Sequence, residues 1–249
     1  TLVVFTSDHG SNMKASLFSL DGTCVPWIIR WPRRIKAGSK CDDLVQNIDL
    51  VPTFFDLAGV EVPDKYIMDG RSLRPVFGGD KPKRWRDHLY FEMGSARAVC
   101  TKDWKYIAVR YSKERIDQIK KARPESLPKL MAYIERTGIG TRGAQNPGFF
   151  DYDQLYDLKK DPKEKRNLAG DPRYSTTIER MRALLKRDLE SFGRPFGEFV
   201  PGGNAAPPGL IDEQVELVKK IRIEGKKIIL PDGHVSGSQP ATDRRQKAT

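Results

Sequence analysis

The four residues Ser7-Asp8-His9-Gly10 place a carboxylate beside an imidazole, directly after the apolar run Leu2–Thr6. If that run is a strand of an open α/β sheet, both side chains lie at its carboxyl end, where such sheets bind ligands. On the turn that leaves the strand, both can reach one ion. Asp supplies an oxygen ligand suited to Ca²⁺ or Mg²⁺, and His supplies a nitrogen. The alternative is an ordinary turn capped by the Asp8 side chain.

Other residue types that could do chemistry are scattered. For the isolated His88 and His234 we expect surface or hydrogen-bonded structural histidines. Arg71, Arg97 and Arg110 could contact an anionic sugar, although salt-bridged or solvated arginines are commoner.

The three cysteines, Cys24, Cys41 and Cys100, are odd in number and far apart. They fit neither a zinc site nor a disulfide framework, so we expect buried or half-buried thiols.

Composition sets broad limits. A chain of 249 residues with 38% hydrophobic residues can form one or two globular domains. The net charge of +11 favours an anionic partner, for which nucleic acid, a membrane surface and a sulfated polysaccharide are all admissible. No nucleic-acid motif accompanies the charge, so we expect no nucleic-acid partner. No apolar run reaches the roughly 18 residues that a transmembrane helix needs.

The elements that must position Asp8 and His9 come first in the chain. Leu2–Thr6 and Val25–Trp31 are mainly apolar runs without polar alternation, which indicates strands covered on both faces. The first run has no initiator Met and is typical of a core strand entered midway, so any export signal is expected upstream. A helical stripe follows within residues 47–58 and ends at Gly59. We assign residues 1–84 to an α/β domain.

The hydrophobic pattern of the sequence changes after residue 84. Short alternating runs at 88–93, 96–101 and 104–111, with a fourth at 154–158, predict an antiparallel meander. Apolar residues from 178 to 192 at helical spacing predict a helix over about 172–191. We therefore expect a second unit at 85–192 with a basic insertion at 112–148. The Pro/Gly-rich and basic tail at 193–249 is expected to hold a short helix near 213–223 and a disordered end from 236.

Several segments, in a fixed order, resemble the sulfatase family of the alkaline phosphatase-like superfamily. TLVVFTSDHG and GTCVPWIIRWP are similar to the family's two core strands, and MDGRSLRPVF at 68–77 to its D-G-x-S-L-x-P element. QLYDLKKDPKEKRNLA at 154–169 resembles the long signature of the C-terminal subdomain. The resemblance covers residues 1 to about 192. It implies the end of a mixed, mostly parallel α/β sheet flanked by helices, followed by a small antiparallel sheet with a packed helix.

The resemblance also implies roles. Asp8 and His9 would be two ligands of a catalytic divalent cation, calcium first and magnesium as the alternative. Lys14 would bind the sulfate and offset its charge as the S–O bond breaks. The nucleophile, a formylglycine made within C-x-P-S-R, is expected upstream, because Cys24-Val25-Pro26 is followed by Trp27-Ile28. Cys24 also stands where many members carry Arg.

Three functions follow for the longer protein. The first is a sulfuric ester hydrolase acting on sulfated sugars or polysaccharides, exported as the family is, while this chain alone is inactive without its N-terminal half. The second is a phosphodiesterase or phosphonate hydrolase of the same superfamily. The third is a non-catalytic polyanion-binding module built on residues 112–142 and 219–227.

Overall fold

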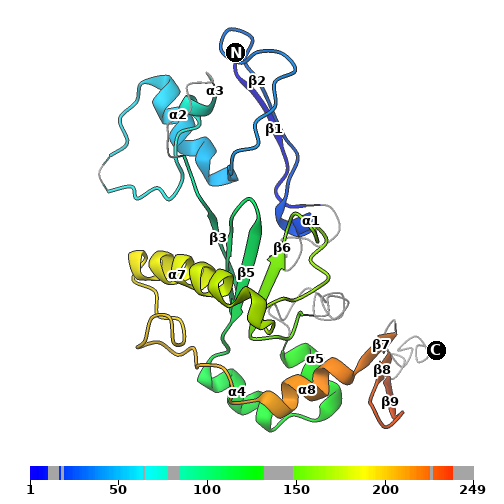
Figure 1. Cartoon of the computed structure of the whole chain (residues 1–249). Helices are drawn as coiled ribbons and strands as arrows, with labels where there is room; N and C mark the ends of the chain where they lie inside the picture. The colour runs from blue at the N-terminus through cyan, green and yellow to red at the C-terminus, as the bar shows by residue number, and fades with distance from the viewer. Residues whose placement is uncertain are drawn as a thin grey trace, which may run out of the picture.

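The computed structural model describes residues 1–10, 17, 20–63, 65–77, 85–131, 148–224 and 227–237. Figure 1 shows an elongated arrangement, with the N-terminal region at one end, a four-stranded sheet in the middle, and a helical layer followed by a small sheet at the other end. None of the helices in these ranges combines the length and apolar character that a membrane crossing requires.

The N-terminal region opens with a two-stranded ribbon. Strand β1 (Val3–Thr6) pairs antiparallel with β2 (Trp27–Arg30), and the short helix α1 (Leu20–Thr23) lies between them in sequence. Its side chains remain open to solvent, and Phe5 is 61% exposed.

A helical segment follows the ribbon. The 3₁₀ turn η1 (Asn47–Asp49) leads into α2 (Leu50–Ala58), which ends at Gly59 in the left-handed region with φ 65°. The short helix α3 (Arg74–Phe77) packs beside α2. Asp49 is fully buried and binds the Arg86 guanidinium at 2.6 and 2.7 Å, which fixes this segment to the residues that enter the central sheet.

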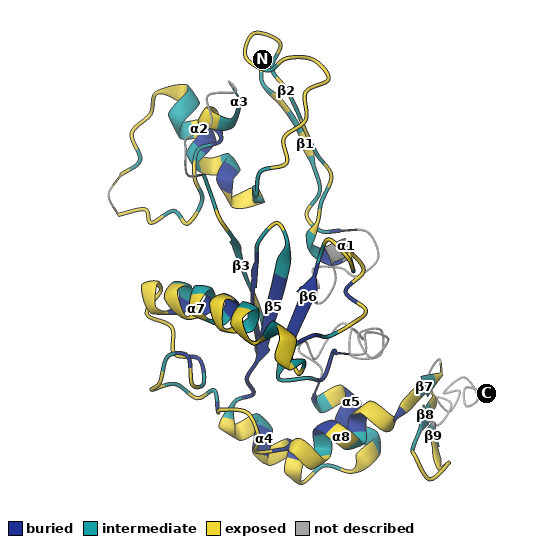
Figure 2. Cartoon of the chain, viewed as in Figure 1, coloured by how far each residue is buried: buried dark blue, intermediate teal, exposed yellow. Residues whose placement is uncertain are grey.

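The central sheet is an antiparallel meander in the order β3-β4-β5-β6. Its strands are β3 (Leu89–Met93), β4 (Ala96–Cys100), β5 (Trp104–Val109) and β6 (Asp153–Asp157). Figure 2 shows β5 and β6 as the most deeply buried strands, whereas the β1–β2 ribbon is at best half-buried.

Helix α7 (Ser175–Ser191) covers one face of this sheet, after the 3₁₀ turn η3 (Pro172–Tyr174). Met181, Leu185 and Leu189 repeat at helical spacing, are completely buried, and pack with Val99 and Tyr106 of the sheet. Burial of each such side chain contributes about 1.5–3 kcal/mol.

The opposite face is covered by helices from two distant parts of the chain. These are α4 (Lys113–Lys120), η2 (Pro124–Ser126), α5 (Leu127–Leu130) and α8 (Asp212–Lys220). A small sheet follows, formed by β7 (Arg222–Glu224), β8 (Lys227–Ile229) and β9 (Val235–Gly237).

Most of the predicted elements are confirmed: both N-terminal strands, the helix within 47–58, all four meander strands, the long helix and the short helix near 213–223. One prediction was wrong in detail. We expected β1 and β2 at the end of a mixed, mostly parallel sheet with both faces covered, but they pair antiparallel with each other, and the described residues contain no parallel pair. No described element flanks this ribbon in a larger sheet, so its apolar side chains stay exposed.

The segment that we described as a tail contributes to the core. Phe196 and Phe199 are 3% and 4% exposed and pack under α7, and Val215 of α8 packs on the other face of the sheet. The predicted disorder from residue 236 falls mostly outside the described residues. The division at residues 84 and 192 stays a proposal.

Candidate functional site

The turn Ser7–Gly10 is held in place at the carboxyl end of β1. The Ser7 hydroxyl donates to the His9 carbonyl at 2.8 Å, and the Gly10 N–H donates to the Gly22 carbonyl at 3.1 Å. Asn47 donates its side-chain amide to the Ser7 carbonyl at 3.1 Å. The turn is thereby tied to α1 and η1, so Asp8 and His9 leave a fixed backbone.

The two side chains present their donor atoms close together. His9 Nδ1 lies 2.6 Å from the Gly10 carbonyl, which can only accept, so Nδ1 is the donor there and Nε2 is the ring atom left to bind a cation. Nε2 is 3.7 Å from Asp8 Oδ1. Both atoms can therefore reach one cation at the distance of about 2.3–2.6 Å that Ca²⁺ prefers. The Asp8 side chain is 82% exposed and open to such a ligand.

The described residues do not complete a metal site. They contain no group of three or more His, Cys, Asp and Glu side chains arranged to hold an ion. Asp8 and His9 could therefore supply two ligands of a cation site. The described residues do not supply the remaining ligands. Lys14, the predicted sulfate-binding residue, lies outside the described residues.

Asp8 and His9 open into a cleft of about 950 Å³ between the N-terminal region and the meander. Its far side includes Lys102 and Asp103 from the β4–β5 turn. Lys102 pairs with Asp43 at 3.3 Å and Lys159 with Asp103 at 2.8 Å. The lysines on the cleft lining are paired with carboxylates, whereas Asp8 and Asp42 add further negative charge to it. This charge distribution favours a cation at the Asp8 end of the cleft.

Cys24, the departure from the family pattern, lines the same cleft and carries an exposed free thiol. The other expectations about cysteines hold in part. Cys100 is buried, and burial raises the pKa of its thiol to about 11, whereas Cys41 is exposed.

Comparison with known proteins identifies the relatives of this chain. Residues 9–123 match the family described as N-sulphoglucosamine sulphohydrolase, C-terminal. An ulvan-active sulfatase of Formosa agariphila is 32% identical over 210 residues, which are 80% of this chain and 39% of that protein. An N-acetylglucosamine-6-O-sulfatase of Bacteroides thetaiotaomicron is 29% identical over 204 residues, 77% of this chain and 30% of that protein.

The chain belongs to the sulfatase family. It corresponds to the C-terminal part and spans less than two fifths of the length of these two relatives. A solved structure in complex with its substrate D-glucosamine-2-N,6-O-disulfate superposes with a TM-score of 0.54 at 25% identity, over 77% of this chain and 34% of that one. The alkaline phosphatase-like α/β fold is confirmed by this likeness.

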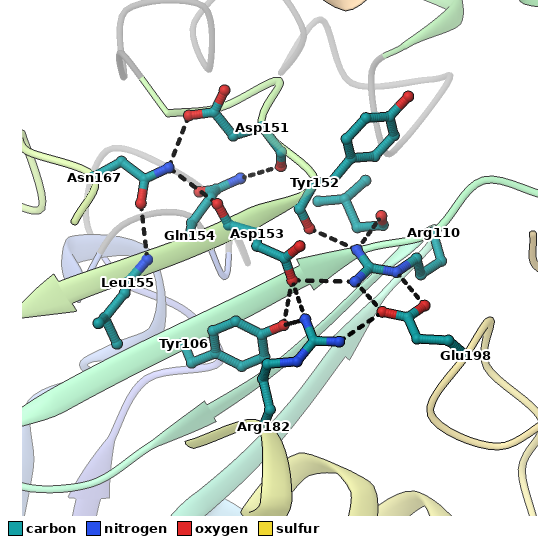
Figure 3. A network of polar contacts seen from close by, with 11 residues as sticks. Tyr106, Arg110, Asp151, Tyr152, Asp153, Gln154, Leu155, Asn167, Arg182 and Glu198 are labelled. Atoms are coloured by element: carbon teal, nitrogen blue, oxygen red, sulfur yellow. Dashed lines mark hydrogen bonds and ion pairs between the residues drawn. The ribbon is translucent and has the colours of Figure 1, made fainter. Parts of the chain in front are cut away.

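The long sulfatase signature at 154–169 has a structural role in this fold. Asn167 accepts from the N–H groups of Leu155 and Ala169 and donates to Asp151 and to the Asp153 carbonyl. Figure 3 shows how it bridges β6 and the following loop. Four hydrogen bonds from one side chain lock the chain reversal after β6.

A buried ion pair lies in the same signature. The Glu164 carboxylate accepts from Lys105 Nζ at 2.9 and 3.0 Å, and both side chains are essentially inaccessible. Glu164 adopts φ 53°, a left-handed conformation that is unusual for this residue type. Because removing either partner would leave an uncompensated buried charge, this contact joins β5 to the loop after β6 beside the cleft.

A second buried network was not foreseen from the sequence. Arg110 is fully buried and donates to Glu198 and Asp153, and Arg182 of α7 contacts the same two carboxylates. Figure 3 shows these four charges meeting beside the Tyr106 hydroxyl. Burial raises the pKa of Glu198, but the hydrogen bonds from Arg110 outweigh it and lower that pKa to about 2. The network connects β5, β6, α7 and the 196–200 segment.

His88 is the structural histidine that we predicted, with partners that sequence spacing could not reveal. Its side chain is 9% exposed, and its ring nitrogens lie 2.6 Å from Asp87 and 2.8 Å from Asp188. Burial opposes the charged ring, but the hydrogen bonds to Asp188 and Asp87 prevail and raise the pKa of His88. Arg97 is salt-bridged to Glu92 at 3.5 Å, as expected of a structural arginine. His234 is exposed.

Proposed function

We propose that this chain is the C-terminal part of a hydrolase of sulfate esters that acts on sulfated sugars or polysaccharides. The observation that carries the proposal is the pair of potential metal-ligand atoms on Asp8 and His9, 3.7 Å apart at the carboxyl end of β1. A carboxylate oxygen and an imidazole nitrogen at this separation can both bind one divalent cation, as expected for a member of the sulfatase family. The substrates named for the relatives, ulvan and sulfated glucosamines, support the substrate class.

In this proposal, Asp8 supplies an anionic oxygen and His9 its Nε2 to a divalent cation, calcium or magnesium. The remaining ligands and the formylglycine nucleophile belong to other parts of the longer protein. When bound, the cation would orient the sulfate and neutralise its charge. Lys14 would bind a sulfate oxygen. The Gly10 carbonyl keeps the proton on His9 Nδ1, so that Nε2 remains a ligand.

The test is sulfate release by the full-length protein. Replacing Asp8 with Asn removes the anionic ligand while preserving size, and we expect activity on sulfated sugars to fall at least about 100-fold. Asp42→Asn, at a carboxylate on the same cleft, is the matched control and should retain most of the activity. Full activity of the Asp8→Asn protein, or phosphate release in preference to sulfate release, would contradict the proposal. The chain 1–249 alone is expected to release no sulfate.

We also infer that the exposed apolar side chains of residues 1–67 pack against the rest of the longer protein. Phe5 and Ile28 are 61% and 62% exposed on the β1–β2 ribbon, and Ile67 is 93% exposed. Apolar exposure on this scale within one region of a chain is typical of an interface.

A further inference from the structure

The segment that follows β2 concentrates positive charge. Residues 30–40, called the basic turn below, read RWPRRIKAGSK and contain no acidic residue. The basic side chains are exposed; they are Arg30, Arg33, Arg34, Lys36 and Lys40.

The basic turn has a defined conformation. The N–H groups of Arg34 and Ile35 both donate to the Trp31 carbonyl, at 2.9 and 2.8 Å. The Arg34 guanidinium lies over the Trp31 ring at 5.8 Å, and that ring packs edge-on against Phe77 at 6.1 Å. Since the backbone is already ordered, binding through this turn would lose little backbone conformational entropy.

Within the part of the chain that the structure describes, these charges also have no carboxylate partner. Many other basic side chains have carboxylate partners: Arg86 binds Asp49, Lys102 binds Asp43, and Arg110 binds Glu198. Within the described residues, no ion pair joins a carboxylate to any of the five side chains of the basic turn. The turn therefore presents cations that a ligand can contact without first breaking an internal pair.

A groove of about 620 Å³ runs beside the basic turn. Ile29, Ile35 and Phe77 contribute apolar surface to it, and Lys36 and Lys40 are on its lining. A polysaccharide offers the matching surfaces, because sugar rings have apolar C–H faces and sulfate groups project from their edges. The turn lies at the opposite end of the β1–β2 ribbon from Asp8 and His9, near the N-terminus in Figure 1.

We propose that the basic turn binds a sulfated polysaccharide chain, so that a polymer is held at the end of the ribbon remote from Asp8 and His9. The inference rests on the proposed function for the substrate class, and on exposure, unpaired charge and the adjoining groove for the site. Single-stranded nucleic acids are bound largely by stacking of bases on free aromatic faces. Trp31 is engaged by Phe77 and Arg34, which favours sulfate groups over bases.

The experiment measures binding of the full-length protein to a size-defined heparin oligosaccharide over a range of salt concentrations. The test variant is Arg33→Gln/Lys36→Gln/Lys40→Gln. The control variant, Lys120→Gln/Lys121→Gln/Arg123→Gln, removes the same charge from exposed residues at the end of α4. We expect the test variant to bind about 10-fold more weakly at low salt and with a shallower salt dependence, because fewer counterions are released. The control should stay within about twofold of the unmodified protein.

Other results of this experiment would contradict the proposal or separate it from the proposed function. Equal loss in the two variants would mean that binding depends on overall charge or also on residues 112–142, and would overturn the proposal that the basic turn is the binding site. Tighter binding of single-stranded DNA than of heparin, lost in the test variant, would make the turn a nucleic-acid site. In the full-length protein, the test variant should hydrolyse a small aryl sulfate normally while the KM for a polymeric substrate rises. If heparin binds at the basic turn but no sulfate is released from any substrate, the proposed binding site is supported and the proposed sulfatase function is contradicted.

Discussion

At the scale of single residues, His88 joins parts of the chain that lie 100 positions apart in sequence. Its ring lies between Asp87, which precedes β3, and Asp188 of α7, and Arg187 Nη2 is 3.4 Å from Nδ1. The pKa of His88 is raised above its ordinary 6.5, so folding favours the protonated ring. Its stabilisation is complete below about pH 6.5 and is lost as the pH rises through the folded-state pKa.

We therefore expect His88→Gln to lower the free energy of unfolding by about 1–2 kcal/mol near pH 5.5, where charged hydrogen bonds are removed, and by less near pH 8.5. Urea unfolding at several pH values measures this difference. His234→Gln is the matched control, because that histidine is exposed. A loss for His88→Gln that does not vary with pH would mean that the ring acts only by packing.

Residue identity alone did not reveal such partners. Asp8 and His9 could be singled out because they are adjacent and follow an apolar run. Arg110 and Glu198 are 88 positions apart, and no periodicity connects them. Their pairing depends on the path of the chain after α7, which is set by tertiary packing.

At the scale of elements, sequence periodicity was a good guide. The alternation in β3 to β6 and the helical repeat of Met181, Leu185 and Leu189 are local patterns, and each element formed where its pattern predicted. The antiparallel pairing of β1 with β2 was not predictable in the same way, because strand direction depends on which strands are neighbours. Composition was a poor guide for residues 193–211, because a Pro/Gly-rich tail gave no indication that Phe196 and Phe199 are core residues.

The packing of that segment gives a direct prediction. Phe199 is 4% exposed, lies 6.5 Å from the Tyr106 ring, and has Arg182 over its face at 4.6 Å. Phe199→Ala should therefore lower the free energy of unfolding by about 3 kcal/mol, as for other buried aromatic side chains. Leu210→Ala, at a 47% exposed position of the same segment, should cost under about 1 kcal/mol. Equal small losses, measured by urea unfolding, would indicate that the segment is peripheral to the fold.

At the scale of the whole molecule, burial is unevenly distributed. The central sheet has apolar side chains on both faces covered by α7 and by α4, α5 and α8, whereas most of the strongly exposed apolar residues fall within residues 1–67. Figure 2 shows the same contrast between the two ends of the molecule. The chain studied alone should therefore combine a cooperative core with an N-terminal region that associates or unfolds.

Phe5 and Ile28 provide the test, because they are cross-strand partners on the exposed face of the β1–β2 ribbon. Phe5→Thr/Ile28→Thr keeps residues that favour strands but removes apolar surface, so we expect less self-association by light scattering and size-exclusion chromatography. The control, Leu210→Thr/Val235→Thr, removes two side chains that are 47% and 50% exposed elsewhere and should change association little. A monomeric, cooperatively melting unmodified chain would argue against an N-terminal interface. If the prediction holds, adding the upstream part of the longer protein should suppress association of the unmodified chain more than of the Phe5→Thr/Ile28→Thr variant, because the same apolar face would then be covered.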